Sequence, residues 1–221
     1  MVNTGATYPG TTGTNTSIGT QDWTNTGNIS ADDNVTADCL FDTVDQISYY
    51  LKATNFGFSI PTGSTIDGIV AEVQCWDQGV AFNTIENSVK IVKGGTISGD
   101  EKSTGAGMNS PPSSTTFTYG SSSDLWGLSW TVSDINASDF GLVWSSKCTS
   151  TMFGGYTNVD FIRITIYYTE GAGPPSPGIN INIGDAWKSS TAIQINIGDS
   201  WKKVTGVQVN IGDTWKPVSL A

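Results

Sequence analysis

The stretch "NVDFIRITIYY", residues 158–168, decides the fold class because its side chains alternate in character over eight positions. Ile162, Ile164, Ile166 and Tyr168 occupy one parity, and Phe161, Arg163, Thr165 and Tyr167 occupy the other. A period of two is typical of a β-strand with one face toward a core. Because that face is wholly apolar, we expect a central strand of a sheet.

Further strands are predicted on both the N-terminal and the central part of the chain. The alternation of "STIDGIVAEVQCW", residues 64–76, indicates a half-buried strand, and "NSVKIVKGG" predicts a strand that ends in a Gly94-Gly95 turn. Strands are also expected in residues 47–61, ending at Pro61, and in residues 116–120. Residues 127–146 predict two strands around a turn or a single helical turn, with Ser133 or Asp134 as its N-cap. Many short strands separated by turns predict an all-β, jelly-roll-like β-sandwich, with its first and last strands close together.

Composition divides the chain into four segments. Residues 1–37 are rich in Thr, Asn and Gly and predict a polar N-terminal arm, either mobile or laid over a neighbouring surface. Residues 38–169 are assigned to the sandwich. Three prolines in residues 170–178 indicate a linker. Residues 179–221 contain three 14-residue β-hairpin repeats, so the sandwich is followed by a small hairpin or meander region.

The repeated unit is "NIGDxWK", with copies at 182–188, 196–202 and 210–216. Gly-Asp suits the two central positions of a type II′ hairpin turn, because glycine tolerates positive φ. The sequence leaves the register open: a two-residue turn pairs Asn196 with Trp201, whereas a three-residue turn pairs Ile197 with Trp201. Short repeats that cannot bury their own apolar residues associate with neighbours, so we expect this tail to pair with the sandwich, with copies from sister subunits or with a host surface; a self-contained miniature barrel is the alternative. The expected interface residues are Ile183, Trp187, Ile195, Ile197, Trp201, Val209, Ile211 and Trp215.

Charge and missing residue types exclude several functions. The chain has a net charge of −10 and no histidine, and residues 1–178 alone carry −11. The acidic body repels phosphate backbones, so we expect no nucleic-acid partner. Without histidine, Ser-His-Asp and Cys-His sites are impossible, and we expect no enzyme and no cofactor. No apolar run long enough for a membrane span occurs, so no membrane partner is expected. Cys39, Cys75 and Cys148 are expected to be buried free thiols.

A few residues remain candidates for binding. Asp32, Asp33 and Asn34 bring together oxygen ligands suited to calcium, although an ordinary Asx-rich turn is the favoured explanation. The carboxylate pairs Asp32/Asp33, Asp100/Glu101 and Glu72 with Asp77 are candidates for glycoside hydrolysis, and we expect them to be solvated surface groups. Trp126 and Trp130 are candidate glycan contacts; the alternative is a role as core or interface anchors.

Several stretches resemble a known family. "NFGFSIPTGSTIDGI", "VKIVKGG", "DLWGLSWTVSDINASDFGLVW" and "NVDFIRITIYY" resemble a β-sandwich module of tailed-bacteriophage structural proteins, and the "NIGDxWK" tail is similar to short Gly-Trp-Lys repeats at the ends of phage tail and minor structural proteins. The resemblance implies a virion component and carries over no catalytic residues.

Together these observations predict a non-enzymatic structural protein on the exterior of a phage particle, of the capsid-decoration or head-fibre type, attached and oligomerised through its terminal segments. We expect a homo-oligomer, with a trimer as the expected state, and other virion proteins such as the major capsid protein as partners. The N-terminus lacks the features of a secretory signal, so we expect folding in the host cytoplasm before incorporation at the virion surface. The alternative is a tail-associated protein that binds a receptor or a host surface glycan.

Overall fold

The structure is a computed structural model that divides the chain into two units, Met1–Gly171 and Ala172–Ala221. It describes residues 1–78, 84–149 and 155–171 and, in the second unit, six short strands. The boundary after Gly171 falls inside the predicted linker 170–178, of which residues 172–178 lie outside the described residues.

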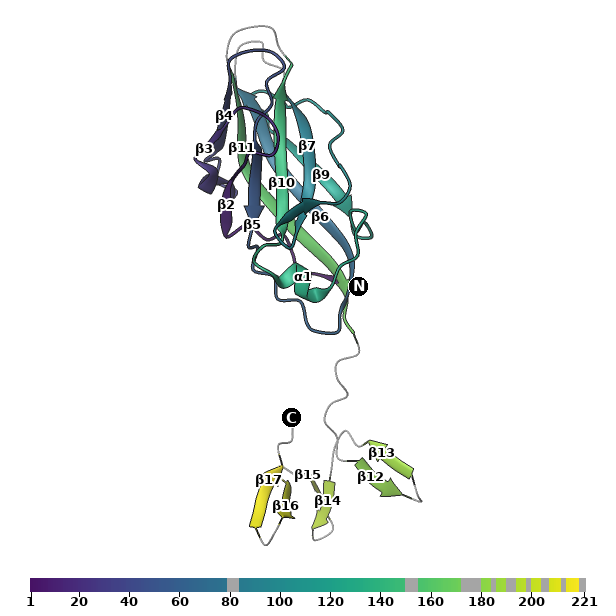
Figure 1. Ribbon diagram of the computed structural model, residues 1–221. Helices are drawn as coiled ribbons and strands as arrows, with labels where there is room; N and C mark the ends of the chain where they lie inside the picture. The colour runs from purple at the N-terminus through teal and green to yellow at the C-terminus, as the bar shows by residue number, and fades with distance from the viewer. Residues whose placement is uncertain are drawn as a thin grey trace. The chain divides into compact units, whose positions relative to one another are not determined.

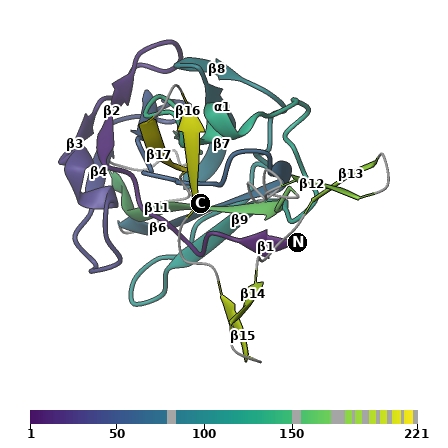
Figure 2. The ribbon, with the colours of Figure 1, turned by 90° about the horizontal axis from the view of Figure 1, so that it is seen from below.

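The first unit is a sandwich of two antiparallel sheets (Figure 1). Figure 2 shows the two layers with β6, β9 and β11 in one and β7 with β8 in the other. One sheet has the order β3 (Trp23–Thr24), β4 (Ala37–Phe41), β11 (Gly155–Thr169), β6 (Thr65–Gln78) and β9 (Thr115–Ser121), with β1 (Val2–Asn3) also paired to β11. The other has the order β2 (Thr11–Asn15), β5 (Tyr50–Thr54), β10 (Gly141–Cys148), β7 (Thr84–Lys93) and β8 (Thr96–Ser98).

The strand that contains the opening stretch lies at the centre of its sheet, as predicted. β11 pairs with β6 over thirteen positions, and on its other side with β4 and then with β1. Ile162, Ile164 and Ile166 are fully buried between the sheets. Burial of such side chains contributes roughly 1.5–3 kcal/mol each, so the alternating isoleucines account for the placement of this strand over the core.

Three other predicted strands are confirmed and one is shorter than expected. β6 covers the alternating stretch, β9 covers residues 116–120, and β7 ends before the expected turn at Gly94 and Gly95, both of which have positive φ. β5 ends at Thr54 rather than at Pro61, because Asn55 and Gly57 adopt positive φ, which a strand does not allow.

The region before β10 differs from the prediction. It contains one short helix, α1 (Val132–Asn136), and no strand among residues 127–130. The N-cap is Thr131 rather than Ser133 or Asp134. The Thr131 hydroxyl accepts a hydrogen bond from the Asp134 amide, and the Asp134 carboxylate accepts one from the Thr131 amide, which together form a capping box.

Residues 1–37 belong to the sandwich and do not form a separate arm. β2 is an edge strand paired to β5, β3 is paired to β4, and the 3₁₀ helix η1 (Thr26–Ile29) buries Ile29 in the core. The polar composition of this segment is compatible with strands because backbone pairing, and not apolar burial, holds most of it. The sequence left open a mobile arm or a segment laid over a neighbouring surface. The second alternative is found, and the surface belongs to the segment's own domain.

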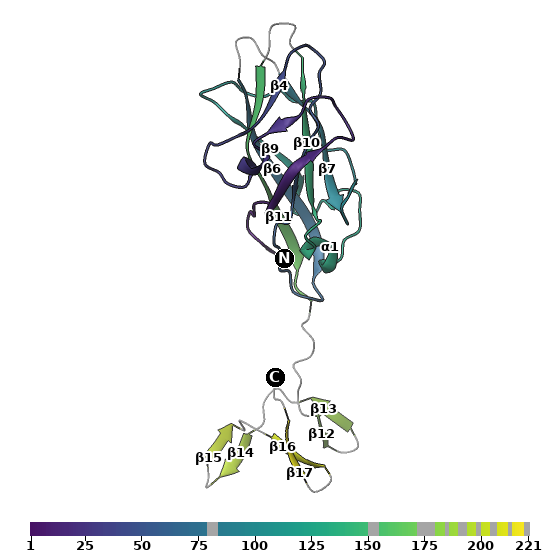
Figure 3. The ribbon, with the colours of Figure 1, turned by 60° about the vertical axis from the view of Figure 1, so that its left-hand side comes forward.

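The N-terminus and the end of β11 lie at the same end of the sandwich as α1 (Figures 1 and 3). Phe41 pairs with Gly155 at the opposite end of the same sheet. The expected proximity of first and last strands is therefore found, because Val2 and Asn3 pair with Tyr168 and Tyr167. Among the described residues no helix has the length and apolar character that a membrane span requires.

The second unit contains three two-stranded antiparallel sheets, one for each repeat. They are β12–β13 (Asn180–Ile183, Ala186–Ser189), β14–β15 (Gln194–Ile197, Ser200–Lys203) and β16–β17 (Val207–Ile211, Thr214–Val218). The predicted hairpins are present, whereas a continuous meander is not found among these described strands. Each strand of this part therefore has one strand partner.

Candidate functional site

The register of the repeats, left open by the sequence, is that of a two-residue connection. Ile197 pairs with Ser200 and Asn196 pairs with Trp201. The other two hairpins repeat this register, with Trp187 opposite Asn182 and Trp215 opposite Asn210. The expected interface residues thus fall into two sets of alternate register positions. One set holds the isoleucines and the valine, and the other holds the tryptophans.

Trp126 and Trp130, the candidate glycan contacts, are not free aromatic platforms. Trp126 is completely buried, and its indole N–H donates to the Ile69 carbonyl at 3.1 Å. Trp130 is half-buried; its indole N–H donates to the Leu125 carbonyl at 2.9 Å, and its ring packs edge-on against Phe140. Both tryptophans therefore act as packing anchors in this fold.

The candidate calcium ligands Asp32, Asp33 and Asn34 do not converge on one point. The carboxylate of Asp33 accepts a hydrogen bond from the Val35 amide at 3.0 Å, as in an Asx turn, and Asn34 has φ of 62°. Asp32 faces Arg163 instead, with 3.9 Å between its Oδ2 and Nη1. No group of three or more His, Cys, Asp or Glu side chains in the described part of the chain is placed to hold a metal ion.

Arg163 organises the outer face of β11 next to this turn. Its Nε and Nη2 donate to the two carboxylate oxygens of Glu72 at 2.9 and 3.2 Å, and its guanidinium lies 4.5 Å from the centre of the Phe161 ring. The hydrogen bonds to Glu72 raise the pKa of Arg163. Glu72 is thus engaged in a bidentate ion pair on the sheet surface, which is a structural arrangement.

Two acidic side chains, Asp77 and Glu86, are buried. The expectation that Asp77 is a solvated surface group is therefore wrong. Asp77 is fully buried, and its Oδ2 accepts from the Thr84 amide while its Oδ1 has no partner. Burial raises the pKa of Asp77. Glu86, which no sequence motif marks, is buried in a hydrogen-bond network with Thr104, Tyr119 and, through Tyr119, Trp144.

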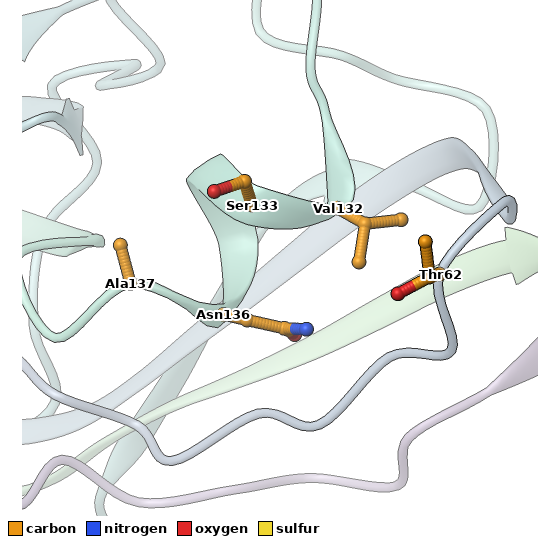
Figure 4. Close-up of a pocket in the computed structure, with 5 residues that line it drawn as sticks. All are labelled: Thr62, Val132, Ser133, Asn136 and Ala137. Atoms are coloured by element: carbon orange, nitrogen blue, oxygen red, sulfur yellow. The ribbon is translucent and has the colours of Figure 1, made fainter.

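A hollow of about 440 Å³ lies beside α1, and Figure 4 shows its lining. Val132 and Thr62 face each other across it, with Ser133, Asn136 and Ala137 completing the wall. Both ends of the Asn136 amide are engaged, by the Ile60 carbonyl and the Ile60 amide. Because none of the five residues is titratable, the hollow offers no acid or base.

The outer face of the β3–β4–β11–β6–β9 sheet carries a group of aromatic and amide side chains that we call the Trp76–Tyr156 patch. Strand register places its residues in two neighbouring rows across β4, β11 and β6. The rows are Leu40, Tyr156 and Gln78, and Asp38, Asn158 and Trp76. Residues directly opposite each other in such rows lie about 5 Å apart between Cβ atoms, so the six side chains adjoin one another.

The patch is unusual in its exposure. Leu40 is 40% exposed and Tyr156 is 43% exposed, which places both among the few large apolar residues on the surface of the described domain. Trp76 is half-buried on the same face. Asn158 is 5% exposed; its Nδ2 donates to Asp38 at 2.6 Å, and its Oδ1 has no hydrogen-bond partner.

Sequence reasoning missed this patch for a definable reason. Alternation continued backward from Ile162 would place Tyr156 and Asn158 toward the core, because all three have even numbers. A β-bulge between Val159 and Phe161 reverses the parity, so Tyr156 and Asn158 point outward. The one usable signal was Trp76, which shares the parity of Glu72 and Gln74 on β6.

No protein-family model matches the chain, and neither a curated protein nor a solved structure matches it. The class that the coordinates define is an all-β protein with a two-sheet antiparallel sandwich and a C-terminal unit of repeated hairpins.

Proposed function

We propose that the protein is a non-enzymatic structural protein that associates with copies of itself through its C-terminal hairpins. The observation that supports this most directly is the strand pairing of the second unit, in which each repeat is a separate two-stranded sheet. An isolated two-stranded hairpin is marginally stable at best in water, whereas three or more strands with an apolar face are stable. Hairpins contributed by sister chains would supply the missing strands.

The sequence of the repeats supports the same proposal. Each hairpin has isoleucine or valine at one set of register positions and a tryptophan at the other. Two-stranded sheets with apolar residues at both sets have more apolar surface than they can bury alone. Association in a closed ring of three chains, our proposed state, would bury both sets without leaving an open edge.

Two further parts of the proposal are the jelly-roll-like topology of the sandwich and the location of the protein on a phage particle. The strand orders β4–β11–β6–β9 and β5–β10–β7–β8, in a chain that changes sheet after each of these strands except between β7 and β8, support a jelly-roll-like arrangement of eight strands. A place on the exterior of a phage particle, as a capsid-decoration or head-fibre protein in contact with the major capsid protein, is supported by the sequence resemblance alone. The N-terminal segment is left out of the proposed attachment because it pairs with β11 and β5 of its own domain.

The test of self-association is the mass in solution of the full chain, compared with a chain that ends at Gly171. We expect an oligomer for the full chain and a monomer for the truncated one, by light scattering or sedimentation. A full-length variant with Trp187, Trp201 and Trp215 all changed to Ser should also become monomeric. The matched control changes Lys188, Lys202 and Lys216 to Gln and should remain oligomeric; monomers throughout would remove the proposal.

The proposed place is tested separately. An antibody raised against the sandwich should label intact particles purified from the lysate that contains the protein, as seen by immunogold electron microscopy. Labelling that appears only after the particles are disrupted would contradict an exterior location, whatever the oligomeric state.

A further inference from the structure

We propose that the Trp76–Tyr156 patch binds a neutral saccharide. The inference concerns the sandwich and is independent of the function proposed for the hairpins. It starts from the side chains at the surface: Tyr156 and Trp76 lie on neighbouring strands, diagonally across the two rows of the patch. Aromatic residues combine a flat apolar face with a polar edge, and the face is complementary to the C–H face of a pyranose ring. Leu40 extends the apolar surface on the β4 side of Tyr156.

The polar members of the patch are suited to hydroxyl groups. Asn158 lies between Asp38 and Trp76 in its row, and its Nδ2 is directed to Asp38 on β4. The amide oxygen is consequently directed away from β4, and it is a buried acceptor without a partner. An unsatisfied buried acceptor is unfavourable, and a ligand hydroxyl that reaches the Asn158 amide oxygen would satisfy it.

Charge selects the class of saccharide. The six residues of the patch include one carboxylate, that of Asp38, and no lysine or arginine. The body of the protein is strongly acidic, with a net charge of −11 over residues 1–178. Sulfated, sialylated or phosphorylated ligands would be repelled, because like charges without a counter-ion oppose association. The electrostatics thus favour an uncharged ligand, and the Gln78 and Asn158 amides and the Asp38 carboxylate supply the hydrogen bonds that fix its orientation.

The position of the patch suits capture of a ligand from solution. Tyr156 and Leu40 lie next to the Gly155–Phe41 pair, at the end of the sheet opposite to Thr169 and Gly171, where the unit ends. In Figures 1 and 3 this is the end at which β4 lies, away from α1 and the N-terminus. The patch therefore lies at the end of the sheet away from Gly171, the last residue of the unit.

The experiment probes the full chain with an array of neutral oligosaccharides, namely glucans, galactans, mannans and N-acetylglucosamine oligomers, alongside sialylated and sulfated glycans. We expect binding to one or more neutral glycans and not to the anionic ones. Calorimetric titration with the strongest neutral glycan should then give an association constant that falls by about tenfold or more in Tyr156→Ala, because the substitution removes the aromatic ring on which the sugar stacks.

The matched control is Tyr167→Ala, which removes a tyrosine from the same face of the same strand outside the patch. It should leave the association constant within about twofold of the wild-type value, since it removes no stacked ring. Tyr156→Phe keeps the ring and should retain most of the binding, which separates a stacking role from loss of folding. The proposal is overturned if no neutral glycan binds, if only anionic glycans bind, or if Tyr156→Ala binds as tightly as Tyr167→Ala.

Discussion

At the scale of the residue, a buried hydrogen-bond network around Glu86 links the two sheets of the described domain. Glu86 is 1% exposed, and its carboxylate accepts hydrogen bonds from the Thr104 hydroxyl and amide on one oxygen and from the Tyr119 hydroxyl on the other. Tyr119 in turn accepts from the Trp144 indole N–H at 3.0 Å. Burial and the hydrogen bond to Glu86 raise the pKa of Tyr119. A buried charge with this many donors is compatible with a stable core.

Tyr119→Phe is expected to destabilise the domain by about 1–3 kcal/mol, because it leaves both Glu86 Oε2 and the Trp144 indole N–H without partners. Urea denaturation of the full chain, followed by the change in near-ultraviolet circular dichroism, measures the effect. Tyr156→Phe is the control at an exposed hydroxyl and should change the free energy of unfolding by less than about 0.5 kcal/mol. Equal effects from the two substitutions would show that the network contributes nothing.

The raised pKa of Asp77 predicts that the stability of the domain depends on pH. Its folded-state pKa lies above the ordinary value of 3.8 because of burial. The folded state therefore holds its proton to higher pH than the unfolded state, and this group lowers stability as the pH rises from about 3.8 through its folded pKa. Asp77→Asn removes that loss. The difference in unfolding free energy between the variant and the wild type should grow in favour of the variant over this window; a constant difference would refute the prediction.

At the scale of the element, α1 shows how a local rule selects among candidate residues. Thr131 has extended φ and ψ of −103° and 158°, and its side chain and that of Asp134 exchange hydrogen bonds with each other's backbone amides. Lys93 lies 3.2 Å from the Asp134 carboxylate and holds it from the neighbouring β7. The cap is thereby fixed by a long-range contact as well as by the local sequence.

Thr131→Ala should cost about 1 kcal/mol through loss of the N-cap, as judged by chemical denaturation. Ser133→Ala, at the exposed position that the sequence also offered as the cap, should have little effect. The reverse ranking of these two substitutions would place the cap at Ser133.

The N-terminal strand makes a second element-scale prediction. The Thr4 and Thr7 amides donate to the carbonyls of Ile166 and Ile164 at 3.1 and 2.9 Å, so the segment covers the edge of β11. Deletion of residues 1–7 should lower the melting temperature and promote association through the uncovered edge, measured by scanning calorimetry and sedimentation. Thr4→Val, which removes only the side-chain oxygen that accepts from the Ile166 amide, is the milder control. A mobile arm, by contrast, would be removable without any change.

How far the sequence predicts these elements depends on whether side chains or backbone determine them. β6 and β11 were predictable because alternating apolar residues mark a half-buried strand. β1, β2 and β3 were missed because edge strands are held by backbone pairing, which leaves no apolar pattern. The Trp76–Tyr156 patch was missed because the bulge after Val159 changes which side of the sheet a given parity faces.

At the scale of the whole molecule, the division after Gly171 separates a unit with a large apolar core from one made of short hairpins. The core cluster of the first unit involves both sheets, η1 and α1, through residues such as Ile29, Ile135, Leu142 and Ile164. Proline-rich composition alone located this division in the sequence. Because the apolar cluster lies within residues 1–171, the stability of the sandwich should not depend on the repeats.

We therefore expect the chain that ends at Gly171 to unfold at the same temperature as the sandwich in the full chain, within about 2 °C. Scanning calorimetry of both proteins at equal concentration measures this, with a second transition permitted in the full chain. A fall of more than about 2 °C would mean that the hairpins stabilise the sandwich, since roughly 1 kcal/mol shifts the melting temperature of a domain of this size by about 2–4 °C.

The pairing of β1 with β11 also has a consequence for synthesis of the protein. Residues 2 and 3 are made long before their partners, Tyr168 and Tyr167. The central strand of the larger sheet, β11, is likewise the last strand of the sandwich to be made, so one edge of β4 and one edge of β6 stay unpaired until then. Such distant pairings fold slowly, and these edges are open to association with other chains until residue 169 has left the ribosome.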